Sequence, residues 1–424
     1  MENLKGKKLL ILGAYGTEIE IVKCAQTMGV YTIVTDNHTD WSLAPAKYAA
    51  DEAWDVSWTD YETLEKMCLS HGVDGIMGGF SERRVACVQE LSSRLGLPFY
   101  ANGADLNKIL RKDNFREACV SAGVDVPKCY SYNDICLPVI MKPADNGGSR
   151  GITVVRNDDD IAKAYKKAAN ASDTNSVVIE EYITADEVMI YYVVHNGIAT
   201  LSAMCDRYMH VFDSNITQLP VGYRFPSKHL ELFENKHDEK FKKLIAELGI
   251  QNGLIAFQSF VDGDRVLPFD PTYRLDGTMA YYTTQHANGS NVLERLIEMS
   301  LTGSMGNDEE ISSSENPHTD AIRFQLPILL GKGVVSSIEG KSEIEKIDGV
   351  YFVNWRIGEG EKMLSSADFS QIACRIQLYA ANEDDLYQKL SQIFNTLKIE
   401  DENGNSLIIY SDAGALAYDE VQRC

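Results

Sequence analysis

Strand-like and helix-like segments alternate through the first hundred residues, and this alternation constrains the fold more than any other feature of the chain. The strands are short apolar runs typical of buried positions, and the helices have apolar side chains three and four residues apart. Strands are predicted at residues 8–13, 31–36, 73–77 and 98–100, with helices at residues 18–28 and 82–95. Because parallel strands need a crossover between them, this succession predicts a doubly wound parallel sheet.

The middle of the chain has a different pattern, in which strands outnumber helices. A helix is expected over residues 105–127, where Gly123 and Pro127 end it. Strands are expected at residues 137–143, 151–155, 176–183 and 187–194. Asp262-Gly263 separates two further apolar runs and is typical of a hairpin turn.

The last quarter of the chain begins after a polar stretch. Residues 302–320 are rich in Ser and Glu and contain Gly and Pro, which is typical of a linker or a mobile surface loop. Strands are then predicted at residues 325–330, 350–355, 372–379 and 406–410, with a helix at residues 383–397.

Charge and cysteine content narrow the function classes. The chain has 40 Lys and Arg against 62 Asp and Glu, a net charge of −22, which opposes binding to nucleic-acid backbones and anionic membranes. Its nine cysteines include no C-x-x-C pair, so reduced thiols are expected rather than disulfides or zinc ligands. The apolar run at residues 9–12 is too short for a signal peptide or membrane helix. We therefore expect a cytoplasmic protein without nucleic-acid or membrane partners.

A lysine at the end of an apolar strand is the strongest chemical signal. Val139-Ile140-Met141-Lys142-Pro143 is followed by Asp145-Asn146-Gly147-Gly148-Ser149-Arg150-Gly151 and a new strand. An ammonium group beside a flexible Gly/Ser loop suits a polyphosphate, because the charge and the backbone N–H groups both favour phosphate oxygens. The alternative is an ordinary glycine hairpin with a lysine that reaches solvent.

A second strand supports the phosphate interpretation. Residues 177–183, Val-Val-Ile-Glu-Glu-Tyr-Ile, form an apolar run with a polar end, and Glu187 follows four residues later. Backbone groups at such an edge can meet an adenine ring, and a nearby carboxylate can accept hydrogen bonds from ribose hydroxyls.

With these segments in place, the chain resembles the ATP-grasp superfamily, which includes biotin carboxylase, the carbamoyl-phosphate synthase large chain, D-alanine–D-alanine ligase and glycinamide ribonucleotide synthetases. The resemblance spans nearly the whole chain. It is carried by Lys112 in Arg111-Lys112-Asp113, then Lys142, the glycine loop, Glu180 to Glu187, and a later acidic-to-arginine segment, in that order. It implies a preATP-grasp domain at 1–104, a two-lobed α+β ATP-grasp at 105–300 (lobes about 105–183 and 184–300), a linker or mobile loop at 301–320 and a C-terminal α/β domain at 321–424.

The resemblance implies a set of ATP-binding residues. Lys112 and Lys142 would hold the α- and β-phosphates, under a cover of Gly147, Gly148 and Ser149. The adenine hinge would consist of Glu180, Glu181, Tyr182 and Ile183, and Glu187 would take the ribose. Arg207 and His210 lie where relatives carry polar residues near the phosphates; a surface role is the alternative for both.

The metal positions depart from the family pattern. Relatives have a Glu on the first strand of the hairpin and Glu-x-Asn-x-Arg on the second, whereas this chain has Gln258 and then Asp270-Pro271-Thr272-Tyr273-Arg274. Asp270 suits Mg²⁺, with Mn²⁺ as an alternative, while Gln258 and Thr272 offer neutral oxygens. The change bears on turnover more than on nucleotide binding.

Two further residues would serve the reaction itself. Arg274 matches the family arginine that stabilises charge on the acyl phosphate, with a salt bridge to Asp270 or Asp276 as the alternative. Glu82 would contact the acceptor substrate, although a carboxylate is also favourable at any helix N-terminus. Arg375 is interpreted as a strand residue.

The predicted function is an ATP-dependent carboxylate–amine (or thiol) ligase that forms an acyl phosphate and releases ADP and phosphate. The rival is a non-catalytic ATP-binding protein with a degenerate metal site, supported by Gln258 and Thr272. A biotin-dependent carboxylase component has little support, because the chain has no biotin-carrier lysine motif. The expected partners are small carboxylate and amine substrates, and a homodimer is one assembly that many relatives form.

Overall fold

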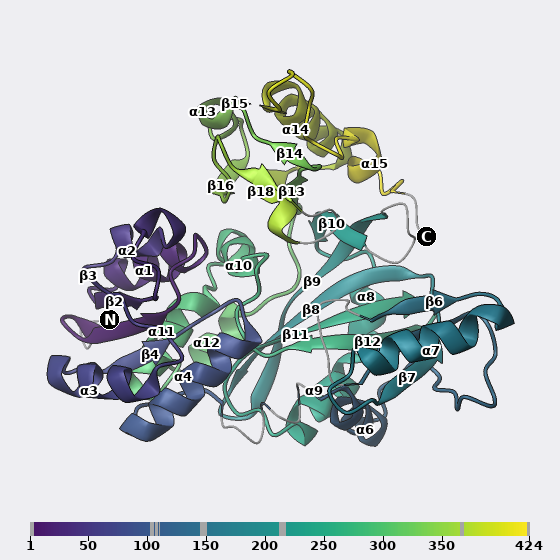
Figure 1. Ribbon diagram of the computed structural model, residues 1–424, viewed down its shortest axis with the longest axis horizontal. Helices are drawn as coiled ribbons and strands as arrows, with labels where there is room; N and C mark the ends of the chain where they lie inside the picture. The colour runs from purple at the N-terminus through teal and green to yellow at the C-terminus, as the bar shows by residue number, and fades with distance from the viewer. Residues whose placement is uncertain are drawn as a thin grey trace.

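The computed structural model describes residues 4–101, 106, 109, 111–144, 151–211, 218–364 and 369–421. Backbone alone is described at Lys112, Asp113, Gln218 and Asp308. Figure 1 shows an N-terminal sheet in purple on one side, a small lobe in teal on the other, and green to yellow C-terminal elements above the long strands between them. In these described segments, no helix has the length and apolar character needed to cross a bilayer.

The N-terminal region forms a parallel sheet in the order β3-β2-β1-β4, which confirms the doubly wound prediction. Its elements are β1 (Lys8–Leu12), α1 (Glu18–Thr27), β2 (Tyr31–Thr35), α2 (Ala46–Ala49), β3 (Glu52–Trp54), α3 (Tyr61–His71), β4 (Gly75–Met77) and α4 (Glu82–Leu95). The strand predicted at residues 98–100 was wrong. Tyr100 instead turns toward the central sheet, where its hydroxyl donates to Tyr273 O at 3.2 Å.

The small lobe is an antiparallel sheet in the order β6-β5-β7. It contains β5 (Val139–Pro143), β6 (Thr153–Val155), α7 (Ile161–Asn170) and β7 (Val177–Glu181). Ala164 and Ala168 of α7 pack on Val139 and Met141 of β5, so a thin apolar layer holds the lobe together. The preceding helix, α6 (Lys112–Ala122), ends at Gly123, as predicted. The predicted single helix over residues 105–127 was wrong in extent, because the backbone is extended at Arg111 and residues 124–127 are not helical.

The central sheet has eight antiparallel strands in the order β12-β11-β8-β9-β10-β13-β18-β16. Its strands are β8 (Asp186–His195), β9 (Ile198–Val211), β10 (Gln218–Phe225), β11 (Gly253–Asp262), β12 (Arg265–Thr272), β13 (Ile322–Leu329), β16 (Val350–Trp355) and β18 (Ile372–Ala380). Phe257 of β11 is fully buried, and its ring centroid lies 5.3 Å from that of Phe241 and 6.2 Å from that of Phe115 of α6. The hairpin predicted around Asp262-Gly263 is confirmed as β11 and β12.

Helices and short strands complete the fold around this sheet. They are α8 (Leu230–Lys236), α9 (Asp238–Glu247), α10 (Ala280–Asn288), α11 (Val292–Thr302), α12 (Asp308–Ser314), β14 (Gly333–Val334), β15 (Ser337–Glu339), α13 (Lys341–Ile344), β17 (Lys362–Met363), α14 (Glu383–Thr396), β19 (Lys398–Glu400) and α15 (Ala413–Ala417). At Gly75 an added Cβ would overlap the carbonyl oxygen of Ser300, so the absent side chain lets α11 pack directly on β4.

The structure corrects the expectation for the end of the chain. β13 pairs with β10, so the C-terminal strands extend the central sheet. Residues 301–320 include helix α12, with Ile311 and Glu315 buried, and are not simply a loop. The strand predicted at 406–410 was wrong, since isolated bridges at Ser406 and Ile408 replace a ladder. The domain boundaries remain predictions.

Candidate active site

A cleft of about 1460 Å³ runs between the small lobe, the central sheet, the N-terminal region and the C-terminal strands. It is larger than the 300–1,000 Å³ of most ligand pockets, so it has room for more than one ligand. It is lined by twelve residues that the sequence singled out: Glu82, Lys142, Glu180, Glu181, Tyr182, Ile183, Glu187, Arg207, Gln258, Asp270, Thr272 and Arg274. Residues from separate segments therefore meet in one place.

Five other predicted residues are not placed at the cleft. Gly147, Gly148 and Ser149 lie outside the described residues, as does the side chain of Lys112 at the start of α6. His210 lies on β9 with its ring centroid 5.7 Å from that of Tyr410, beyond the cleft lining formed by Met209 and Val211. Its phosphate role stays a prediction without support from this geometry.

The phosphate lysine is positioned by strand pairing. β5 and β7 run antiparallel with Ile140 opposite Glu180, which brings Lys142 Nζ to 2.5 Å from Glu180 Oε2. Arg116 Nη1 lies 3.8 Å from the other oxygen of the same carboxylate. Glu180 is thus a buried carboxylate held between two cations, and it fixes the direction of the lysine.

The hinge after β7 connects the small lobe to the central sheet. Glu181 Oε1 accepts hydrogen bonds from Lys128 N at 2.9 Å and Arg265 Nη1 at 3.3 Å. The Tyr182 N–H donates to Pro138 O at 3.1 Å, and the Tyr182 ring lies beneath the guanidinium of Arg156 at 5.0 Å. The backbone of this segment is therefore held in place at the mouth of the cleft.

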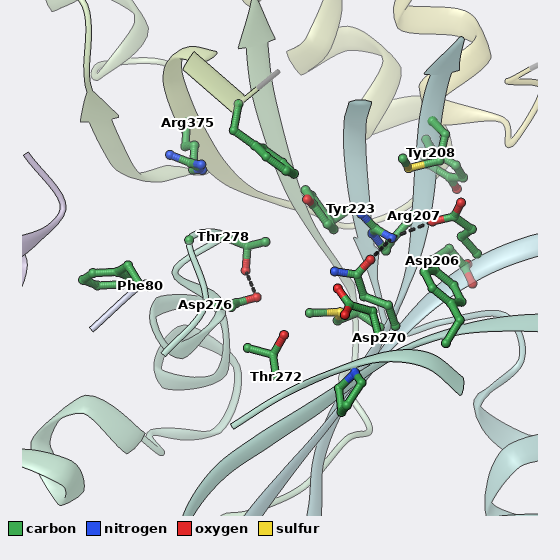
Figure 2. Close-up of a pocket in the computed structure, with 18 of the residues that line it drawn as sticks. Phe80, Asp206, Arg207, Tyr208, Tyr223, Asp270, Thr272, Asp276, Thr278 and Arg375 are labelled. Carbon is green, nitrogen blue, oxygen red and sulfur yellow. Dashed lines mark hydrogen bonds and ion pairs between the residues drawn. The ribbon is translucent and has the colours of Figure 1, made fainter. Parts of the chain in front are cut away.

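Neighbouring strands carry a row of polar side chains across the floor of the cleft. Asp270 of β12 is in register with Gln258 of β11, and Glu187 of β8 is in register with Arg207 of β9. A register shift directly after Gln258 is a β-bulge, a feature that redirects side chains. Thr272 follows on the same face of β12 as Asp270. Figure 2 shows Asp270, Thr272 and Arg207 on this floor.

Only part of the family metal set is available here. Asp270 is an exposed carboxylate at the cleft, and Thr272 adds a hydroxyl. Gln258 Oε1 accepts a hydrogen bond from Arg207 Nη1 at 3.0 Å. Among the described residues, no three His, Cys, Asp or Glu side chains cluster closely enough to hold a metal alone. One carboxylate and one hydroxyl suit a Mg²⁺ ion that takes its other ligands from phosphate and water.

The predicted catalytic arginine forms an ion pair across the cleft. Arg274 Nη2 lies 2.5 Å from Glu82 Oε1, and its Nη1 donates to Leu275 O at 2.8 Å. The Phe80 N–H donates to the same carbonyl oxygen, so the loop before α4 is tied to the end of the hairpin. The partner is Glu82 rather than Asp270 or Asp276.

The sequence reasoning missed the cationic wall that faces the N-terminal region. Arg375 on β18 and Arg356 just after β16 both line the cleft. Arg375 is 8% exposed, and its Nη1 is buried without a hydrogen-bond partner among the described residues. Burial, followed by the like charge of Arg356, lowers the pKa of Arg375 to about 10. The signal in the sequence is an arginine within the apolar run Ile372–Ala380, where the local pattern indicates only a strand position.

Comparisons with known proteins agree with this architecture. Residues 116–213 match the family model described as D-ala D-ala ligase C-terminus. A formate-dependent phosphoribosylglycinamide formyltransferase of Trichormus variabilis is 28% identical over 191 residues, covering 42% of this chain and 48% of that protein. The chain thus spans about half the length of this curated relative.

Solved structures cover more of the chain at lower identity. The crystal structure of L-amino acid ligase from Bacillus licheniformis has a TM-score of 0.77 at 16% identity, covering 94% of this chain and 100% of that one. The biotin carboxylase domain of a Hydrogenobacter thermophilus 2-oxoglutarate carboxylase, in complex with MgADP, ADP and bicarbonate, has a TM-score of 0.76 at 15% identity, covering 93% and 90%.

The fold of this chain is therefore similar to the folds of these two solved structures. The relatives named above are a formyltransferase, an amino acid ligase and a biotin carboxylase domain.

Proposed function

We propose that this chain is an ATP-dependent ligase that joins a carboxylate to an amine or thiol through an acyl phosphate, releasing ADP and phosphate. The ATP would lie between the small lobe and the central sheet, with Lys142 and Lys112 on the phosphates. Ile183 and its neighbours would meet the adenine, and Glu187 the ribose. Similarity of fold and the arrangement of the cleft support this proposal, since phosphoryl transfer depends mainly on positioning and fixed charge.

The cationic wall formed by Arg375 and Arg356 is the observation that favours a ligase over a protein that only binds ATP. Figure 2 shows Arg375 on the same side of the cavity as Phe80, Asp276 and Thr278, away from Asp270 and Arg207. A buried guanidinium nitrogen without an acceptor, such as Nη1 of Arg375, costs free energy unless an anion pairs with it. Nucleotide binding at the hinge does not need this cation. A second, anionic ligand does, and a substrate carboxylate fits it.

The reaction would take place between these two halves of the cleft. Arg274 lies two residues after β12 ends at Thr272, and it lines the cleft, where its planar guanidinium can face a transferred phosphoryl group. Arg375 and Arg356 would orient the carboxylate that attacks the phosphorus. A Mg²⁺ ion at Asp270 and Thr272 would supply further neutralisation of the triphosphate.

Partners and location follow as part of the same proposal. The substrates are small molecules that fit the volume of the cleft not filled by ATP. Measurement of the molecular mass in solution tests whether the chain forms a homodimer. Eight cysteines in the described residues are free thiols, which supports function in the reducing cytoplasm.

A substrate screen tests this function. Purified protein, ATP and Mg²⁺ would be mixed with pairs of carboxylic acids and amines or thiols, and ADP and phosphate release would be measured. We expect at least one pair to stimulate release, and Arg375→Met to remove the stimulation while ATP still binds. Arg94→Met, a change at an exposed position on α4, serves as the matched control. If no pair in a broad screen yields ADP, the protein only binds nucleotide.

A further inference from the structure

Arg207 lies between the ribose side and the metal side of the proposed ATP site. Its Nη1 is 2.5 Å from Glu187 Oε2 and 3.0 Å from Gln258 Oε1, and its side chain is 5% exposed. Figure 2 draws dashed lines from Arg207 to neighbouring side chains near Asp270. The guanidinium also lies over the Tyr223 ring at 5.8 Å. Packing and hydrogen bonds therefore hold a cation at the floor of the cleft.

The Glu187 carboxylate lies directly against this buried guanidinium and supplies its counter-charge. The two described contacts both use Nη1, whereas a guanidinium has five donor hydrogens. The Nη2 hydrogens can therefore meet a phosphate oxygen, since Arg207 lines the cleft.

The contact with Gln258 affects which atoms can bind metal. Gln258 has one carbonyl oxygen, it is neutral, and it accepts a hydrogen bond from Arg207. A Mg²⁺ ion on that oxygen would lie at about 2.1 Å from it, which places a dication close to the guanidinium. Two cations sharing one neutral oxygen repel strongly in a buried site. Gln258 therefore does not suit a metal, although it occupies a family metal position.

We propose that Arg207 acts as a built-in cation in place of a second divalent ion, so that this chain binds ATP with one metal ion, held at Asp270. The inference rests on the ATP binding of the proposed function and deepens it. Lys142 and Arg207 would approach the triphosphate from opposite lobes, and the metal would lie on the β12 side. An arginine cannot be removed by chelators, so part of the charge neutralisation would be independent of metal concentration.

The number of bound metal ions tests the proposal without requiring turnover. Wild-type protein would be titrated with Mn²⁺ at saturating adenylyl imidodiphosphate, a nonhydrolysable ATP analogue, and bound Mn²⁺ counted by electron paramagnetic resonance. We expect one Mn²⁺ per bound nucleotide. Two per nucleotide overturn the proposal and leave the ligase function intact. If the analogue does not bind with any divalent ion, both fail.

Two variants sharpen the result. In Gln258→Glu the new carboxylate still faces Arg207, so the count should stay at one. Combining it with Arg207→Met removes the guanidinium and should raise the count to two. Circular dichroism would confirm that each variant is folded. If Gln258→Glu alone binds a second Mn²⁺, the guanidinium does not exclude metal and the proposal is wrong. If the double variant does not fold, the number of Mn²⁺ ions bound per nucleotide in wild type, one or two, still decides whether the proposal holds.

Discussion

Arg274 and Glu82 lie 192 positions apart in the chain, yet their side chains form an ion pair with Nη2 2.5 Å from Oε1. One follows the hairpin of the central sheet and the other opens helix α4 of the N-terminal region. The predicted catalytic arginine and the predicted substrate residue are thus partners. A substrate carboxylate or phosphoryl group would compete with Glu82 for the same guanidinium.

With a productive substrate pair, Arg274→Lys should lower the rate of ADP formation by about 10²–10³-fold. This is the typical cost of losing a fixed oxyanion donor. Lysine keeps the charge but loses the planar pair of donors. Nucleotide affinity, measured by calorimetry, should stay within a few-fold of wild type.

A structural role for the same ion pair predicts a different outcome. In that case Arg274→Lys and Glu82→Gln would lower the melting temperature alike and leave ADP formation unchanged. Arg94→Lys on the exposed face of α4 controls for the chemical change itself.

Lys142→Ala should abolish the rise in melting temperature that millimolar ATP and Mg²⁺ give to wild type. Ligand binding stabilises the native state by mass action, and loss of the strand-end cation removes a phosphate contact. Differential scanning fluorimetry measures the shift, and Lys163→Ala, at an exposed position on α7 of the same lobe, is the control. An equal shift in Lys142→Ala would place the triphosphate elsewhere.

Glu315→Gln should flatten the pH dependence of stability above about pH 4.5, the ordinary carboxyl value. Burial raises the pKa of Glu315, although hydrogen bonds from Ser202 and Ser290 oppose the shift. A carboxyl with a raised pKa stabilises the fold at low pH and loses that contribution as pH rises through its folded pKa.

Thermal melts from pH 4.5 to 8 measure this effect. Wild type should lose more stability than Glu315→Gln across the range. Glu310→Gln, an exposed position on α12, should behave as wild type. Parallel curves for wild type and Glu315→Gln would show that Glu315 does not titrate there.

Phe257→Ala should lower the free energy of unfolding by about 3–5 kcal/mol, the usual cost of removing a buried phenyl ring. Phe257 is 0% exposed and contacts rings from α6, α9 and β8. Chemical denaturation measures the loss. Leu69→Ala, 70% exposed, should change stability by less than about 0.5 kcal/mol. A loss below about 1 kcal/mol would mean that the cavity collapses or fills.

The sequence predicted elements where local pattern decides structure. Helix α4 has the bounds expected from its apolar spacing, and Lys142 lies at a strand end as its run indicated. The pairing of β10 with β13 was not predicted, because it joins segments about a hundred residues apart. The local pattern does not specify such long-range register.

The same reason separates the site residues that were predicted from those that were missed. Lys142 and Glu187 belong to short motifs, and each can be recognised alone. Arg375 can be recognised as a site residue only from its burial near Arg356 at the cleft. The contact between Arg207 and Gln258 likewise depends on strand order, and the spacing of residues along the chain does not predict it.

The continuity of the eight-stranded sheet has a consequence for handling this molecule. A truncation after residue 320, intended to isolate the nucleotide-binding half, would strip β13 from β10. The exposed strand edge would be a template for aggregation. Movement during a reaction cycle is then expected in the three-stranded lobe, swinging about the hinge after β7, with the long sheet as a rigid platform beneath it.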